Sequence, residues 1–401
     1  MINISKLYCG LAGQSDELRY AHTGSTGPIV VYNCTPRCNL RCLHCYSNSN
    51  AGSPRFVQPR LDAESRRAGE AGRRDAELDT KEAKKLLADV IEVNTPVVLF
   101  SGGEPLLRGD LFELMAEAKR LKLRTVISTN GTLIDESTAA KLKDANLAYA
   151  GISLDGAEPF HDRFRQSKGA FKATLKGIEN CQKAGLRTGL RFTITKSNAS
   201  QVSTIFDIAR ETGIRRLCFY HLVRCGRGAE IETEVLEPAQ TRGVIDTILE
   251  KTDEFIGKQL AEEVLTVGNH ADGPYMIVKM QKEHRAGFED AKRLLLANGG
   301  NRIGQGISCV SWNGDVFADQ FWRNYSLGNV TQKSFKQIWT NENNPVLMRL
   351  RNKDKFADKR CKRCKWFALC RGNYRFLGPD PADKNWLLEP ACYLTDAEIK
   401  V

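Results

Sequence analysis

The sequence predicts an α/β fold built on a parallel β-sheet. Six apolar segments of strand length alternate with helix-like segments between residues 28 and 222, which is typical of right-handed βαβ units. Polar or glycine-rich motifs follow several of these segments directly, as expected where reactive groups gather at the carboxyl ends of parallel strands. A cysteine-rich pattern beyond residue 300 predicts a second, C-terminal unit.

The predicted strands, in chain order, are 29–32, 97–100, 124–128, 148–154, 188–194 and 216–220. The predicted helices between them are 79–93, 110–122, 135–146, 170–184 and 198–212. The first helix begins at Asp79, which has the spacing of a capping box with Glu82. Residues 236–299 look helical, and residues 307–318 predict a hairpin with a tight turn at Asn313-Gly314.

These patterns predict four parts in the chain: an N-terminal lead-in at 1–27, a core at 28–235, a helical connector at 236–299 and a cysteine-rich domain at 300–401. Within the core, residues 50–79 alternate Arg, Glu, Ala and Gly, which is typical of a solvated insertion. A basic lid over an anionic substrate is a second interpretation of this insertion.

Composition limits the classes of protein. The chain has 401 residues, a formal net charge of +11 and 13 cysteines. It has neither a membrane-length apolar run nor a secretion-signal pattern, so we expect no membrane partner and a cytoplasmic location. Disulfides are rare in that compartment, so clustered cysteines indicate metal or cluster ligation. The positive charge fits an anionic small molecule or solubility alone, and no basic stripe or helix-turn-helix pattern indicates nucleic acid.

The most informative motif is a cysteine loop after the first predicted strand, with the spacing Cys38-x3-Cys42-x2-Cys45. Cysteine sulfur is the usual ligand of iron–sulfur clusters. Three thiolates can hold one face of a 4Fe–4S cube and leave one iron open to a small molecule. His44 lies inside this loop, where we expect it to pack.

Further motifs follow the later strands. Paired glycines at 102 and 103 allow a close backbone approach to a ligand, and Glu104 offers a carboxylate for an ammonium group. Each motif alone is also consistent with an ordinary strand-to-helix turn or a structural arginine. The other candidate binding residues at strand ends or on strands are Ser128, Asn130, Ser153, Asp155 and Arg191.

Together, these motifs resemble the radical S-adenosylmethionine (SAM) superfamily over residues 28–222. The resemblance implies a partial (β/α)6 TIM-like barrel with a 4Fe–4S cluster on Cys38, Cys42 and Cys45, whose open iron binds the amino and carboxylate groups of SAM. It also implies that the Gly102–Glu104 motif meets the amino group and that the strand-end residues meet the ribose or carboxylate. One-electron reduction, from a donor such as ferredoxin or flavodoxin, then yields a 5′-deoxyadenosyl radical that takes a hydrogen atom from the substrate.

The tail contains a second set of cysteines, Cys361-x2-Cys364-x5-Cys370 followed by Cys392. A zinc site is one interpretation of these four ligands. Beside a radical SAM core the set resembles the SPASM/twitch-type extension, which implies a second, auxiliary 4Fe–4S cluster. Two further ligand positions of the full pattern are Asp319 and Tyr374 here, so we expect one auxiliary cluster. Cys309 is interpreted as a buried cysteine.

Other segments resemble the radical SAM enzymes that make modified hemes, on the sequences at 4–10, 219–223, 226–228, 269–273, 319–322 and 390–395. The resemblance favours the AhbC family of didecarboxysiroheme deacetylases over the NirJ family of heme d1 synthesis. It implies an anionic tetrapyrrole that loses acetate side chains to give iron-coproporphyrin; a NirJ role would alter propionates instead. His221 and His270 are candidates for contacting the macrocycle, with structural roles as the alternative.

Two other functions fit parts of the pattern. A SPASM-type maturase of a ribosomal peptide would share the two cysteine sets, but the short lead-in at 1–27 has no room for the peptide-binding domain that such enzymes commonly carry. A zinc-stabilised binding protein, of a different class, would use the tail cysteines alone.

Overall fold

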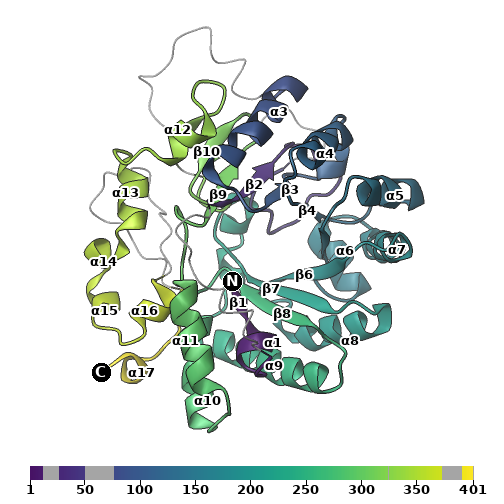
Figure 1. Ribbon diagram of the computed structural model, residues 1–401. Helices are drawn as coiled ribbons and strands as arrows, with labels where there is room; N and C mark the ends of the chain where they lie inside the picture. The colour runs from purple at the N-terminus through teal and green to yellow at the C-terminus, as the bar shows by residue number, and fades with distance from the viewer. Residues whose placement is uncertain (12–26, 50–75, 324, 373–390, 401) are drawn as a thin grey trace.

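The computed structural model describes residues 1–11, 27–49, 76–323, 325–372 and 391–400 (Figure 1). These residues form a single large sheet with helices around it. The strands are β1 Ile2–Asn3, β2 Ile29–Asn33, β3 Val98–Ser101, β4 Thr125–Thr129, β5 Tyr149–Ser153, β6 Thr188–Ile194, β7 Arg216–His221, β8 Glu263–Val267, β9 Ile307–Val310, β10 Asp315–Phe317 and β11 Gly328–Asn329.

The sheet has eleven strands in the order β1-β8-β7-β6-β5-β4-β3-β2-β9-β10-β11. Strands β2 to β8 are parallel and neighbour one another in chain order. The six predicted strands correspond to β2–β7, and Figure 1 shows these strands curving with helices on their outer side. The expectation of an α/β fold with a partial barrel is confirmed.

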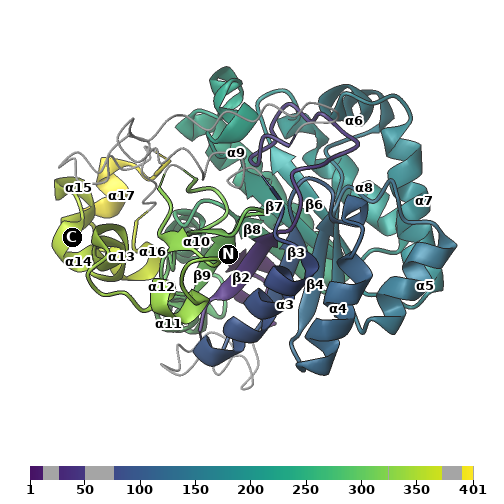
Figure 2. The ribbon, with the colours of Figure 1, turned by 90° about the horizontal axis from the view of Figure 1, so that it is seen from above.

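The helices that follow the barrel strands form the outer layer, while the later helices lie together beside the barrel (Figures 1 and 2). Asp79 and Glu82 form the predicted capping box at the start of α3. The helices are α1 Ile4–Leu7, α3 Thr80–Asp89, α4 Leu111–Arg120, α5 Glu136–Asp144, α6 Glu158–Arg165, α7 Ala170–Lys183, α8 Val202–Thr212, α9 Pro238–Gly257, α10 Asp272–Lys282, α11 Phe288–Asn298, α12 Phe335–Trp339, α13 Pro345–Arg351, α14 Lys353–Phe356, α15 Lys359–Lys362, α16 Phe367–Cys370 and α17 Asp396–Ile399.

Aromatic side chains fill the space between the last barrel strands and the helices that cover them. The ring of Phe206 on α8 lies 5.4 Å from that of Phe219 on β7 and 4.9 Å from that of Phe255 on α9. All three side chains are almost fully buried, and such contacts add to the stabilisation from buried apolar area. This packing fixes the end of β7, which carries part of the site described below.

The prediction that residues 236–299 are wholly helical is wrong. Strand β8 lies between α9 and α10 and pairs in parallel with β7. The segment Glu263-Val-Leu-Thr-Val267 is short and rich in β-branched residues, which favour strands, but long helical patterns on both sides obscure it. The parallel array therefore has one more strand in chain order than we predicted.

The first residues of the lead-in at 1–27, which by its scattered Gly and Ser reads as a polar segment, are packed onto the sheet. Residues 2–3 form β1, which pairs antiparallel with β8, and Ile4 and Leu7 of α1 are buried. Residues 12–26 of the lead-in, and residues 50–75 of the predicted insertion at 50–79, lie outside the described residues. The four-part division of the chain remains a prediction.

The predicted hairpin at 307–318 is present as β9 and β10. Its turn is one residue longer than the predicted Asn-Gly turn, because the amide of Ser311 donates to the carbonyl of Asp315 at 2.8 Å. Gly314 adopts a φ of +88°, which glycine tolerates without strain. Strand β9 pairs in parallel with β2, so the hairpin fastens the C-terminal region directly to the strand that precedes the cysteine loop.

Candidate active site

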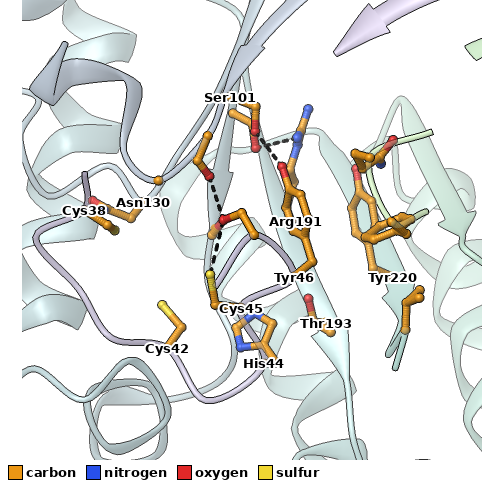
Figure 3. A pocket seen from close by; sticks show the side chains of 18 of the residues that line it. Cys38, Cys42, His44, Cys45, Tyr46, Ser101, Asn130, Arg191, Thr193 and Tyr220 are labelled. Carbon is orange, nitrogen blue, oxygen red and sulfur yellow. Dashed lines mark hydrogen bonds between the residues drawn. The ribbon is translucent and has the colours of Figure 1, made fainter. Parts of the chain in front are cut away.

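A cavity of about 180 Å³ lies at the carboxyl ends of the parallel strands. The cysteine loop forms one side, and residues of β3 to β7 form most of the rest (Figure 3), with Gln320 and Phe321 from the C-terminal region also in the lining. Nine of the predicted site residues line the cavity, namely Cys38, Cys42, Cys45, Gly102, Gly103, Ser128, Asn130, Ser153 and Arg191. Two more, Glu104 and Asp155, do not line the cavity and are buried behind its wall.

The two glycines after β3 allow the cysteine loop to pack closely against the strand end. The amide of Gly103 donates to the carbonyl of Thr35 at 2.8 Å, and that of Glu104 donates to Arg37 at 2.8 Å. A Cβ on Gly103 would lie 2.1 Å from the Arg37 oxygen, and one on Gly102 would lie 2.5 Å from the Thr35 oxygen. The close approach that these glycines permit is therefore made by the loop that carries the cysteines.

Each cysteine of the loop has a polar hydrogen near its sulfur. The Leu40 amide donates to Cys38 Sγ at 3.4 Å, and Ser47 Oγ lies 3.4 Å from Cys45 Sγ. Burial raises the pKa of Cys38 to about 12, which favours the neutral thiol, whereas a bound metal favours the thiolate. Donors of this kind support sulfur ligands of a cluster, and the loop fits such a group.

Arg165, which we did not predict, supplies the third sulfur contact. Its Nη1 donates to Cys42 Sγ at 3.3 Å, and its Nη2 lies 2.5 Å from Asp155 Oδ2. Arg165 ends α6, a helix absent from our prediction, and the carbonyls of Phe164 and Arg165 accept hydrogen bonds from Leu43 and Arg41. The helix end therefore docks onto the cysteine loop and brings a buried cation to a predicted ligand.

Asp155 is the partner of this cation. Its side chain is fully buried, and its Oδ1 accepts a hydrogen bond from the Thr193 amide at 3.0 Å. Burial acts to raise the pKa of Asp155, but the Arg165 charge, together with His44, His161 and the Thr193 amide, outweighs it and holds the pKa below its usual value. His44 stacks on Phe164 with ring centroids 4.6 Å apart, in agreement with the expectation that it packs within the loop.

Glu104 is 1% exposed and is held by three donors. Thr129 Oγ1 donates to it at 2.7 Å, the Asn130 amide at 2.8 Å and the Leu106 amide at 3.3 Å. Burial raises the pKa of Glu104 to about 7 even though these bonds favour the carboxylate. The side chain thus joins the ends of β3 and β4 beside the cavity, and its predicted contact with the amino group of SAM remains a prediction.

Arg191 projects from β6 into the cavity wall. Its Nη1 donates to Ser128 Oγ at 2.7 Å across β5, where the missing side chain of Gly151 leaves room for the guanidinium. Its Nε is buried and has no hydrogen-bond partner among the described residues. An unsatisfied buried donor in a cavity wall fits an oxygen-bearing ligand, such as the carboxylate or ribose predicted there.

The loop after β7 also binds the cysteine loop, through Arg227. Arg227 donates from its amide to the carbonyl of Cys45 at 3.0 Å and from Nε to that of Cys42 at 2.9 Å. Gly226 must be glycine because a Cβ there would lie 2.4 Å from the Cys45 oxygen. The loop after β7 therefore holds the backbone between the predicted ligands.

Each of the four tail cysteines takes part in electrostatic interactions with others of the set. Burial raises the pKa of Cys370 to about 12, and the thiols of Cys364 and Cys392 contribute to this increase. The Gly372 amide donates to Cys370 Sγ at 3.3 Å, and Arg360 Nη1 donates to Cys392 Sγ at 3.3 Å. Cys309 lies apart in β9, fully buried, as we expected. The donor set fits a second iron–sulfur group, although the number of such groups remains a prediction.

A parallel barrel whose strand-end cavity is lined by a three-cysteine loop is the arrangement of a radical SAM enzyme. The family model described as the radical SAM superfamily matches residues 32–220, and the SPASM model, described as an iron-sulfur cluster-binding domain, matches residues 302–365. The cofactors are therefore SAM, a 4Fe–4S cluster and an auxiliary iron–sulfur centre. These matches overturn the interpretation as a zinc-stabilised binding protein.

Full-length relatives identify the group within this class. Fe-coproporphyrin III synthase of Methanosarcina barkeri is 45% identical over 100% of this chain and 99% of its own length. Pre-heme d1 synthase of Dinoroseobacter shibae is 34% identical over 94% of this chain and 88% of its own length. The chain belongs to the radical SAM family of heme-synthesising enzymes that contains these two proteins.

Among solved structures, Streptococcus suis SuiB bound to its precursor peptide SuiA shares the fold, with a TM-score of 0.67 at 17% identity over 92% of this chain and 76% of that one. Within the described residues, none of the helices has the length and apolar composition that crossing a membrane requires.

Proposed function

We propose that this enzyme removes the acetate side chains of didecarboxysiroheme and so forms Fe-coproporphyrin III. The observation that carries the proposal is the end-to-end match, at 45% identity, to a protein named for that product. The match to pre-heme d1 synthase is weaker in identity and in coverage, which makes a propionate-modifying activity the second candidate.

Charge supports a tetrapyrrole with several carboxylates as the substrate. The chain has a formal net charge of +11, and a positive field attracts anionic ligands and speeds their association. A ferredoxin- or flavodoxin-type electron donor and a cytoplasmic location complete the proposal.

The residues of the cavity would have distinct roles in binding the cluster and SAM. When bound, the cluster and SAM supply a 5′-deoxyadenosyl radical by one-electron reduction. Cys38, Cys42 and Cys45 would hold the cluster, and Arg191 with Ser128 would hold the carboxylate or ribose of SAM. The strand ends and the cysteine loop enclose this space and limit the access of water, which prevents loss of a reactive species before it meets the substrate.

Mass analysis of the tetrapyrrole product tests the proposal. The cluster-loaded protein is incubated without oxygen with didecarboxysiroheme, SAM and dithionite. We expect the mass to fall by two acetate units, with no change when Cys42→Ala protein is used. Altered propionates would assign the activity to the second candidate. An unchanged tetrapyrrole would overturn both candidates and favour a peptide substrate.

A further inference from the structure

The cavity at the cysteine loop is small for a site that would hold both a cofactor and a macrocycle. Its volume of about 180 Å³ lies below the range of roughly 300–1,000 Å³ that small-molecule sites usually have. We therefore expect a tetrapyrrole to extend from this first cavity into neighbouring space.

A second cavity, of about 400 Å³, adjoins the first one. His221 and Leu222, at the carboxyl end of β7, line both cavities. Apolar side chains suited to the face of a macrocycle line much of the second cavity, namely Ile194, Leu222, Val235, Leu236 and Pro238. A cation, Arg224, lies in the same wall and is paired with Glu232, whose side chain is 66% exposed. A ligand carboxylate could replace this exposed glutamate on the arginine.

His221 is held in place at the junction of the two cavities. Its Nε2 lies 3.0 Å from Oδ2 of Asp272, which is 1% exposed. The hydroxyl of Tyr393 donates to the other oxygen of Asp272 at 2.7 Å. Among the described residues, Nδ1 of His221 has no hydrogen-bond partner. A carboxylate hydrogen-bonded to one nitrogen of an imidazole fixes the orientation of the ring.

We propose that the second cavity binds the tetrapyrrole, and that His221, oriented by Asp272, contacts one carboxylate side chain of the macrocycle through its free ring edge. This inference rests on the proposed function and adds the place and the polar contact of the substrate. His221 is a positioning residue in it: a side chain held at the shared wall is presented to the first cavity, where hydrogen abstraction would occur.

Ligand binding by the cluster-loaded protein without SAM tests the inference, with Fe-coproporphyrin III as the probe and tryptophan fluorescence as the readout. We expect His221→Phe to weaken binding of the free acid by about tenfold, the usual order for losing a hydrogen bond to a charged group. Binding of the methyl-esterified macrocycle, which has no carboxylates, is expected to be equal in wild type and variant. His284→Phe, at an exposed histidine, is the matched control and should bind as wild type does.

His221→Phe leaves Asp272 without its partner, so His221→Gln is the second variant. It keeps a donor for Asp272 but lacks the second ring nitrogen, and it should also bind the acid more weakly and the ester normally. Equal loss of acid and ester binding in a folded variant, or no loss of either, would overturn the inference and leave the proposed function standing. A wild-type protein that binds neither Fe-coproporphyrin III nor didecarboxysiroheme would overturn the proposed function itself.

Discussion

At the scale of single residues, Arg165 connects the cysteine loop to the barrel. It contacts Cys42 Sγ across 123 residues of sequence and forms a buried ion pair with Asp155. We had predicted Asp155 as a cofactor contact because it follows a strand end. In the structure this carboxylate pairs with Arg165. Asp155 therefore acts on the site by holding the guanidinium that contacts Cys42.

We predict that Arg165→Met lowers the reduction potential of the SAM-binding cluster. Reduction adds negative charge beside Cys42, and a cationic donor to a sulfur ligand stabilises the reduced state. Losing it should shift the reduction equilibrium by about tenfold, which corresponds to about 59 mV for a one-electron couple. Redox titration followed by electron paramagnetic resonance measures this shift. Arg163→Met, at an exposed position of the same helix, is the control. Equal potentials at equal iron content would show that Arg165 is only structural.

Glu104 allows a test by pH. Burial raises its pKa to about 7, and only the ionised form attracts the ammonium group of SAM. If Glu104 contacts SAM, the affinity should therefore increase as the pH rises through 7, by up to about tenfold per pH unit below the pKa. Calorimetric titration between pH 6 and 8 measures this slope. Glu104→Gln should abolish the slope, whereas Glu113→Gln on the exposed face of α4 should keep it. A slope that persists in Glu104→Gln would assign Glu104 to anchoring Thr129 and Asn130 alone.

At the scale of elements, the site depends on how the cysteine loop docks between strand ends and helix ends. The loop bonds to the turn after β3, to the end of α6 and to the loop after β7. Each contact includes a backbone hydrogen bond, and the contacts after β3 and β7 need glycine because a side chain there would intrude.

Gly103→Ala tests this docking. Its Cβ would meet the Arg37 oxygen at 2.1 Å, so the loop must shift. We expect a loss of about 1–3 kcal/mol in the free energy of unfolding, typical of overpacking, and reduced iron content after cluster reconstitution. Urea unfolding and iron analysis measure these effects. Gly243→Ala on α9, with no atom within 4 Å of the added Cβ, should stabilise by about 0.5–1 kcal/mol. Normal stability and iron content in Gly103→Ala would contradict the account of the loop.

Sequence patterns predicted elements well where they repeat and poorly where they are short. Strands β2–β7 and the α3 cap follow from local alternation and capping residues. Strand β8 was missed because five residues lie between two long helices, and α6 because Pro159 and its polar neighbours suggest a loop. The cysteine sets were predictable because their spacing is local. Arg165 and the partnership of His221 with Asp272 were not, because each depends on packing between distant segments.

At the scale of the whole molecule, residues 391–400 join the cysteine-rich domain to the barrel. Arg242 of α9 donates from Nε to the carbonyl of Tyr393 at 3.1 Å and pairs with Glu398. The side-chain amide of Asn269 donates to the carbonyl of Ala391 at 2.7 Å. Cys392 lies between these two anchors. The segment that carries a predicted auxiliary ligand therefore also forms part of the second cavity, through Ala391 and Tyr393.

Isotope transfer tests the central claim most directly. Didecarboxysiroheme deuterated only at its acetate methylenes is incubated without oxygen with the reduced, cluster-loaded enzyme and SAM, and the 5′-deoxyadenosine formed is analysed by mass spectrometry. The proposed function predicts that deuterium enters 5′-deoxyadenosine as acetate is lost from the macrocycle. Deuterium that appears only when the propionate methylenes are labelled instead, or 5′-deoxyadenosine without deuterium from either position, would contradict it.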